Sequence, residues 1–180
     1  MITNKVLTLP RSIVLVGLMG AGKSSVGKIL AQMLDVPFAD SDKEVEDAAG
    51  CTITTIFATH GETAFRDCER RVIKRLLEEE PHIIALGGGA FINDETREIV
   101  QDTAFSIWIK ADLDVLVKRT SNKTHRPLLL QGDPSEILGK LMEERHPIYA
   151  LANLTVESGD GAKEEVAENI LQELKQFLGQ

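Results

Sequence analysis

Cysteine, basic charge and long apolar runs are all scarce in this sequence, and each scarcity removes a class of protein. The two cysteines, Cys51 and Cys68, do not form a Cys-x-x-Cys pair and lie in segments predicted to be helical, so we expect reduced thiols rather than a disulfide framework or a zinc site. The apolar run at residues 13–16 is far too short to cross a bilayer. Residues 1–10 lack the pattern of a secretion signal, and we therefore expect a soluble, cytoplasmic protein.

The charge balance argues against two kinds of partner. The sequence has 20 Lys and Arg against 28 Asp and Glu, which gives a formal net charge of −8. Nucleic acids and anionic membranes are held mainly by clustered basic side chains, so we expect neither, and a small-molecule partner is favoured. Because no heptads or exposed apolar repeats indicate an obligate partner chain, we expect a monomer.

Short apolar segments alternate with longer amphipathic ones along the chain. A length of 180 residues with 43% hydrophobic residues fits one domain, residues 1–180. The predicted strands lie at residues 12–16, 37–39, 82–86, 104–109 and 155–156, and the predicted helices at 23–34, 62–80, 94–101, 112–120, 134–150 and near the C-terminus, with a short amphipathic segment at 52–61. This alternation predicts an α/β fold with a parallel sheet covered on both faces.

A glycine-rich octet follows the first predicted strand and opens the first predicted helix. Residues 17–24 read Gly-Leu-Met-Gly-Ala-Gly-Lys-Ser and match the pattern Gly-x-x-x-x-Gly-Lys-Ser. In this P-loop motif, backbone N–H groups surround the phosphates of a nucleoside triphosphate, the lysine neutralises charge and the serine hydroxyl binds Mg²⁺. A dinucleotide fingerprint would need a third glycine where Ser25 stands. The octet therefore predicts a nucleotide-phosphate site.

Asp40 and Asp42 follow the second predicted strand, at the sheet edge where ligands bind in open α/β folds. If the chain is extended there, both carboxylates point the same way. One can then hold a metal-bound water near Ser24, while the other accepts a proton from a hydroxyl nucleophile or orients it. The alternative is that one aspartate caps the helix starting near Lys43. These residues alone support the two interpretations about equally.

Two arginines also have a structural and a functional interpretation. Arg66 and Glu69 lie three apart on one predicted helix face and can form an ordinary exposed ion pair. Arg145 and Tyr149, four apart on another helix, repeat this ambiguity. Taken alone, the Arg66 and Glu69 spacing favours the structural interpretation.

Residues 87–89 are three glycines after an apolar strand. Consecutive glycines are entropically costly, which indicates the close approach of a ligand or of another backbone segment, although a tight turn is the alternative. Arg126 stands in the polar stretch 121–133. This stretch is either a lid that closes over phosphates or an ordinary surface loop.

Taken in order, these motifs resemble the shikimate kinase family. They are the octet, Asp40-Ser41-Asp42, Phe57, Gly61-Glu62, Phe65-Arg66-x-x-Glu69, Gly87-Gly88-Gly89, Arg126-Pro127-Leu128-Leu129 and Arg145-x-Pro147-x-Tyr149. The set spans nearly the whole chain, and its joint order and spacing carry the resemblance. It implies a fold like that of the nucleoside monophosphate kinases: a five-stranded parallel sheet in the order 2-3-1-4-5 flanked by helices, a substrate-binding segment near residues 42–80 and a lid near residues 121–133.

The resemblance also implies an activity with Mg²⁺ as cofactor and with ATP and shikimate as partners. ATP would phosphorylate the 3-hydroxyl of shikimate on the route to chorismate and the aromatic amino acids. The implied ATP-binding residues are Gly20, Ala21, Gly22, Lys23, Ser24, Ser25, Arg119 and Arg126, with Arg119 against the adenine and Arg126 on the phosphates. Ser24 and Asp40 would hold the metal, Asp40 through water.

On the acceptor side, the resemblance implies that Asp42 binds the reacting hydroxyl and serves as its base. The implied substrate contacts are Asp42, Phe57, Phe65, Arg66, Gly87, Gly88, Gly89 and Arg145, with the two arginines on the carboxylate. Glu69 would orient an arginine. Asp42, Lys23 and Arg126 would be the catalytic residues.

Two other functions are considered. Other small-molecule P-loop kinases, of the gluconate or nucleotide type, share the octet and the sheet, but they are not expected to combine Asp-x-Asp, Phe-Arg-x-x-Glu and three glycines. A non-catalytic nucleotide-binding regulator usually loses catalytic charge, whereas Lys23, Asp40, Asp42 and Arg126 are all present here.

The sequence departs from the family pattern at one place. Ala152-Asn153 stands where Ala-Asp is often expected before the last strand. We therefore assign no adenine contact to residues 153–160.

Overall fold

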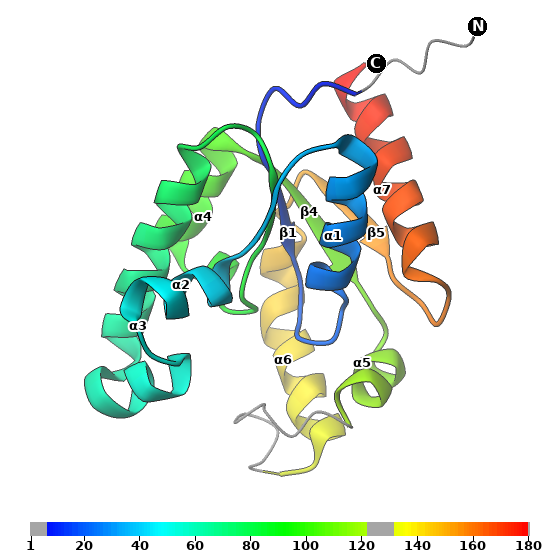
Figure 1. The fold of residues 1–180 in the computed structure, drawn as a ribbon. Helices are drawn as coiled ribbons and strands as arrows, with labels where there is room; N and C mark the ends of the chain where they lie inside the picture. Colours follow the sequence, from blue (N-terminus) through cyan, green and yellow to red (C-terminus); the bar gives the residue numbers. More distant parts are fainter. Residues whose placement is uncertain (1–6, 122–131, 180) are drawn as a thin grey trace, which may run out of the picture.

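The computed structural model describes residues 7–121 and 132–179, and at its centre is a five-stranded sheet (Figure 1). The strands are β1 (Ile13–Val16), β2 (Phe38–Asp40), β3 (Ile83–Ala85), β4 (Phe105–Lys110) and β5 (Leu154–Glu157). Their order is β2-β3-β1-β4-β5, and each neighbouring pair is parallel. The expected parallel sheet and its strand order are confirmed.

Helices surround this sheet. They are α1 (Lys23–Leu34), α2 (Ser41–Ala49), α3 (Ile53–Leu77), α4 (Asp94–Thr103), α5 (Leu113–Thr120), α6 (Pro134–Tyr149) and α7 (Lys163–Leu178), with a short 3₁₀ helix, η1, at Ala90–Ile92. In Figure 1, α1 packs beside α7, and α3 packs beside α4. β1 and β3 are buried along their whole length, as strands covered on both faces should be. Within residues 7–121 and 132–179, no helix is long and apolar enough to cross a membrane.

Local sequence explains where several helices begin. The side chains of Thr52 and Asn93 accept hydrogen bonds from the first turns of α3 and α4, and Asp133 does the same for α6, whose first residue is Pro134. Such caps satisfy backbone N–H groups that have no partner inside the helix. The expected division near residue 61 is present as a break within α3, where Gly61 has φ 82° and ψ 176°.

Two expectations about local structure were wrong. Cys51 lies in the connection between α2 and α3 rather than in a helix, although Cys68 is helical and both thiols are free. The chain is extended only as far as Asp40, because Ser41 already starts α2. Asp40 and Asp42 therefore do not share one face of a strand, and their carboxylates belong to two different environments.

Candidate active site

The P-loop connects β1 to α1. It packs tightly against β4, the neighbour of β1 in the sheet, and against α5. Gly17 has φ +146°, and a Cβ added there would lie 2.6 Å from the carbonyl oxygen of Ile109. Gly20 has φ +83°, and its Cβ would lie 2.8 Å from Cγ2 of Thr120. Neither position accepts a side chain. The loop therefore closes directly onto the N-terminus of α1, where backbone N–H groups and the helix dipole favour an anion.

Lys23 and Ser25 occupy the first turn of α1. The Nζ of Lys23 donates to the carbonyl oxygens of Gly17 at 2.7 Å and Leu18 at 3.0 Å, so its charge lies over the loop. Ser25 Oγ is 3.2 Å from Nζ of Lys163, which donates to it from the start of α7. Lys163 is a second cation near the loop, and nothing in the sequence pattern pointed to it.

Asp40 uses its two carboxylate oxygens for two different purposes. Oδ1 accepts from the backbone N–H groups of Asp42 at 3.1 Å and Lys43 at 3.4 Å, which caps α2. Oδ2 accepts from the hydroxyl of Ser24 in the P-loop at 2.5 Å. The helix-cap interpretation is confirmed for Asp40, and its role in holding a metal-bound water stays a prediction, although the same carboxylate also contacts the P-loop serine.

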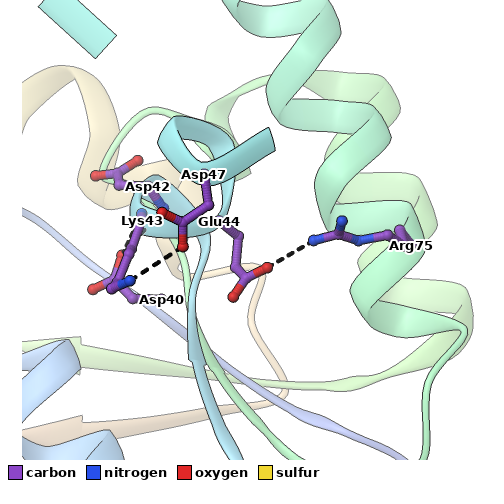
Figure 2. Close-up of polar contacts among 6 residues, drawn as sticks. All are labelled: Asp40, Asp42, Lys43, Glu44, Asp47 and Arg75. Atoms are coloured by element: carbon purple, nitrogen blue, oxygen red, sulfur yellow. Dashed lines mark hydrogen bonds and ion pairs between the residues drawn. The ribbon is translucent and has the colours of Figure 1, made fainter. Parts of the chain in front are cut away.

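Asp42 lies in the first turn of α2 and points to the opposite side of that helix from Glu44. Figure 2 shows its carboxylate directed away from the ion pair between Glu44 and Arg75, which joins α2 to α3 at 2.7 Å. Burial raises the pKa of Asp42, and the nearby carboxylate of Asp40 adds to this increase, while the positive charges of Lys23 and Arg66 oppose it. The carboxyl is thus more basic than an exposed aspartate.

Each of the three glycines at 87–89 faces a charged side chain. A Cβ at Gly87 would lie 2.4 Å from Oδ1 of Asp42, and one at Gly89 would lie 2.4 Å from Nη2 of Arg66. At Gly88 the nearest atom would be Nη1 of Arg145, at 3.3 Å. The absence of side chains at these positions gives three charged groups, which come from α2, α3 and α6, room to approach the segment closely.

Arg66 is held by a carboxylate that is almost fully buried. Its Nη1 donates to Oε2 of Glu69 at 2.7 Å, and the side chain of Glu69 is 2% exposed. Burial raises the pKa of Glu69, and the guanidinium of Arg66 opposes that increase. The expectation of an ordinary exposed ion pair is wrong here, because α3 turns this face toward the core.

Two phenylalanines stand beside Arg66. The rings of Phe57 and Phe65 are 4.7 Å apart, and the guanidinium carbon of Arg66 lies 5.0 Å from the centre of the Phe65 ring. Phe65 is buried, whereas Phe57 is 39% exposed. An exposed aromatic side chain next to a partly exposed arginine can form the wall of a binding site.

Arg145 and Tyr149 approach the same glycines from α6. The hydroxyl of Tyr149 donates to the carbonyl oxygen of Gly88. Burial raises the pKa of Tyr149, and the positive charge of Arg145 opposes that increase. Tyr149 thus stays a neutral donor near neutral pH, one helical turn from Arg145.

Arg119, at the end of α5, joins the P-loop to the segment after β5. Its Nη1 donates to the carbonyl oxygens of Gly20 and Ala21, both at 3.2 Å, and to Oγ of Ser158 at 3.1 Å. Its Nη2 donates to the carbonyl oxygen of Gly159 at 2.5 Å. The expected adenine contact stays a prediction, but the structure adds a second role, which is to hold the loop.

Asn153, the departure from the family pattern, has a structural role between β4 and β5. Its Oδ1 accepts from the backbone N–H of Ser106 at 2.9 Å and lies 3.2 Å from the Ser106 hydroxyl. An aspartate could accept both contacts equally well. The substitution therefore leaves the pairing of the last two strands intact.

The structure groups the expected residues into two adjoining clusters. Lys23, Ser24, Asp40 and Arg119 lie at or beside the P-loop, and Asp42, Arg66, Glu69 and Arg145 lie around the three glycines. The two clusters meet at the start of α2, where Asp40 ends β2 and caps the helix and Asp42 lies in its first turn. Arg126 and most of the expected lid lie outside residues 7–121 and 132–179.

Comparison with known proteins bears directly on this arrangement. A family model described as shikimate kinase matches residues 19–175. The chain belongs to the shikimate kinase family. The chain is 54% identical over 166 residues to a shikimate kinase of Caulobacter vibrioides, covering 92% of this chain and 83% of that protein. A shikimate kinase of Paramagnetospirillum magneticum is also 54% identical, over 93% of this chain and 86% of its own length.

Solved structures give the same result for the fold. A shikimate kinase from Acinetobacter baumannii in complex with shikimate has a TM-score of 0.88 and 36% identity, over 92% of this chain and 93% of its own. A gluconokinase from Sinorhizobium meliloti has a TM-score of 0.66 at 19% identity, over 95% of both chains, and shares the fold alone. The expected activity, ATP-dependent phosphorylation by a shikimate kinase, is confirmed, and the gluconate-kinase alternative has no such support.

Proposed function

We propose that this enzyme transfers the γ-phosphoryl group of ATP to the 3-hydroxyl of shikimate, in the space between the P-loop and the segment Gly87–Gly89. The observation that carries the proposal is the convergence of Asp42, Arg66 and Arg145 on these three glycines. Two guanidinium groups and one basic carboxylate suit an acceptor that has one carboxylate and several hydroxyl groups. The product would enter the route to chorismate.

Arg66 and Arg145 would bind the carboxylate of the acceptor. A guanidinium group offers two parallel N–H donors that match the two oxygens of a carboxylate. Glu69 fixes Arg66 through the 2.7 Å contact with Nη1, so that little side-chain entropy is lost on binding. Phe57 and Phe65 would wall the pocket, and the N–H groups of Gly88 and Gly89 would meet the substrate.

Asp42 would bind the reacting hydroxyl and accept its proton. Its pKa is raised by burial, and a more basic carboxylate is a better proton acceptor as long as it remains ionised at the working pH. Phosphoryl transfer depends mainly on placing the nucleophile in line with the leaving group. Asp42 would therefore contribute as much by orienting the hydroxyl as by removing its proton.

The phosphates of ATP would lie on the P-loop, with contacts from Gly20, Ala21, Gly22, Lys23, Ser24 and Ser25. Ser24 Oγ and Asp40 Oδ2 provide two oxygens that are 2.5 Å apart, and oxygen ligands with retained water suit Mg²⁺. We propose that Ser24 binds this ion directly and Asp40 through water. When bound, Mg²⁺ neutralises charge on the transferred phosphoryl group.

Two arginines would complete the nucleotide side. Arg119 is proposed to lie against the adenine while it holds the P-loop carbonyl oxygens. Arg126 is proposed to reach the phosphates from a lid at residues 121–133. A closed lid would also exclude water, which competes with the hydroxyl group as the phosphoryl acceptor.

The organisation of the molecule is proposed to follow from the same reasoning. Residues 1–180 would form one monomeric domain in the cytoplasm, where ATP is available, with residues 42–80 as the substrate-binding segment. The single sheet with one continuous buried core supports the one-domain arrangement.

The test is a coupled assay of ADP release with Mg²⁺-ATP. Shikimate, quinate, gluconate and nucleoside monophosphates are compared at matched concentrations, and turnover with shikimate alone is expected. Arg66→Lys should raise the KM for shikimate about tenfold, because an ammonium group cannot reproduce two parallel donors. Arg71→Lys, an exposed arginine of the same helix, is the control. A selective effect of Arg66→Lys on ATP would contradict the assignment.

A further inference from the structure

Besides the backbone bonds from Ala90 and Ile92 to the carbonyl oxygens of Gly87 and Gly89, the segment Gly87–Gly89 makes two hydrogen bonds with side chains that belong to no catalytic step. The N–H of Gly87 donates to Oγ of Ser41 at 3.0 Å, and the carbonyl oxygen of Gly88 accepts from the hydroxyl of Tyr149. Ser41 and Tyr149 are both fully buried. Both side chains are therefore fixed within the packed interior.

Each of these bonds leads to a helix that carries one of the charged groups of the acceptor site. Ser41 is the first residue of α2 and directly precedes Asp42, while Tyr149 ends α6, one turn after Arg145. Asp42 and Arg145 in turn lie against Gly87 and Gly88. The glycine segment and the two charged side chains thus form one connected unit.

We infer that Ser41 and Tyr149 are positioning residues that clamp the glycine segment from two sides and so align Asp42 and Arg145 on the acceptor. Three residues without side chains have no packing of their own to fix their position. Their hydrogen bonds must do so, and small errors in the placement of reacting groups are costly. This inference rests on the acceptor site proposed above.

The competing explanation is that the two bonds only stabilise the fold, and the chain offers a matched control for it. Oγ of Ser12 accepts from the backbone N–H of His82 at 3.2 Å, and Ser12 is buried. Ser12 and His82 directly precede β1 and β3, at one end of the sheet. Ser41 and Gly87 follow β2 and β3, at the opposite end. Ser12→Ala removes the same kind of bond next to the same strand, but far from the acceptor.

The experiment compares Ser41→Ala, Tyr149→Phe and Ser12→Ala by steady-state kinetics and thermal unfolding. We expect the first two to raise the KM for shikimate about threefold or more, the effect of one neutral hydrogen bond, while the KM for ATP stays unchanged. Ser12→Ala should lower the unfolding temperature about as much as Ser41→Ala does, but it should not change the KM for shikimate. Ser41→Thr, which keeps the hydroxyl, should restore the wild-type KM.

A smaller rise in KM for both Ser41→Ala and Tyr149→Phe, or an equal rise for Ser12→Ala, would overturn the inference. If one variant does not fold, the other decides. Arg66→Lys distinguishes a failure of the clamp from a failure of the proposed function. A raised KM for shikimate in Arg66→Lys together with an unchanged KM in both clamp variants would leave the proposed function intact and reject the clamp.

Discussion

Gly89→Ala tests whether the glycine segment is required by the side chains that face it. The added Cβ would lie 2.4 Å from Nη2, 2.8 Å from Nη1 and 2.9 Å from Cζ of Arg66. An ordinary contact needs about 3.5 Å, so the guanidinium must move back by about 1 Å. Nη1 is the atom that donates to Glu69 at 2.7 Å, and this movement would strain or break that bond.

The size of the effect follows from the bond that is lost. A hydrogen bond to a charged group contributes about 1.5 kcal/mol or more, which corresponds to about tenfold in binding. We therefore expect the KM for shikimate of Gly89→Ala to rise about tenfold, with little change in the KM for ATP. The backbone N–H of residue 89 is retained, so its loss would not explain the result.

Steady-state kinetics with either substrate varied measures this change, and Gly139→Ala is the matched control. Gly139 lies within α6, and a Cβ there would meet only Cδ2 of Leu113, at an ordinary 3.8 Å. This control should leave both KM values unchanged and stabilise the helix by about 1 kcal/mol. A KM for shikimate within twofold of wild type in Gly89→Ala would refute the reasoning.

The remaining predictions concern Asp42, Arg119 and Asn153. Asp42→Asn should lower kcat about 100-fold or more with little change in the KM for ATP; an unchanged kcat would remove Asp42 from the acceptor site. The same variant should unfold at a higher temperature than the wild type at a pH where the wild-type carboxylate is ionised, because burial disfavours the charged form. As the pH falls through the raised pKa of Asp42, the wild-type carboxylate is protonated, and the difference in unfolding temperature between the two proteins should shrink. A difference that stays constant with pH in calorimetry would contradict the burial argument. Arg119→Met should raise the KM for ATP about tenfold and spare shikimate, because two P-loop carbonyl oxygens lose a charged donor; equal effects on both substrates would argue against it. Asn153→Asp should change the free energy of unfolding in urea by less than about 0.5 kcal/mol. Asn153→Ala should lower it by about 1 kcal/mol, because both contacts with Ser106 are lost. Equal losses in the two variants would show that the acceptor oxygen at position 153 does not contribute to stability.

The sheet was predictable because its signals are local. Apolar β-branched runs such as residues 13–16 and the octet that follows them are read directly from neighbouring residues, and the family resemblance supplied the strand order. The role of Asp40 was harder to predict, because the residues alone supported a helix cap and a carboxylate beside the metal equally. A carboxylate has two oxygens, and here one caps α2 while the other meets Ser24.

What the sequence did not reveal depends on contacts between distant segments. The spacing of Arg66 and Glu69 places them on one helix face but does not say what packs against that face, so the burial of Glu69 was missed. The partners of Arg119 at Ser158 and Gly159 are about 40 residues away along the chain. The sequence pattern assigns no role to Ser41, although its hydroxyl accepts a hydrogen bond from the backbone N–H of Gly87.

The glycine segment also limits how the acceptor preference of this enzyme can evolve. At Gly87 and Gly89 even a methyl group would collide with Asp42 or Arg66, and at Gly88 it would crowd Arg145. Even the smallest substitution at these three positions therefore displaces a charged side chain of the acceptor site. New acceptors are more accessible through changes in α3 and α6, where the opposing side chains originate and where a longer or shorter residue has room to act.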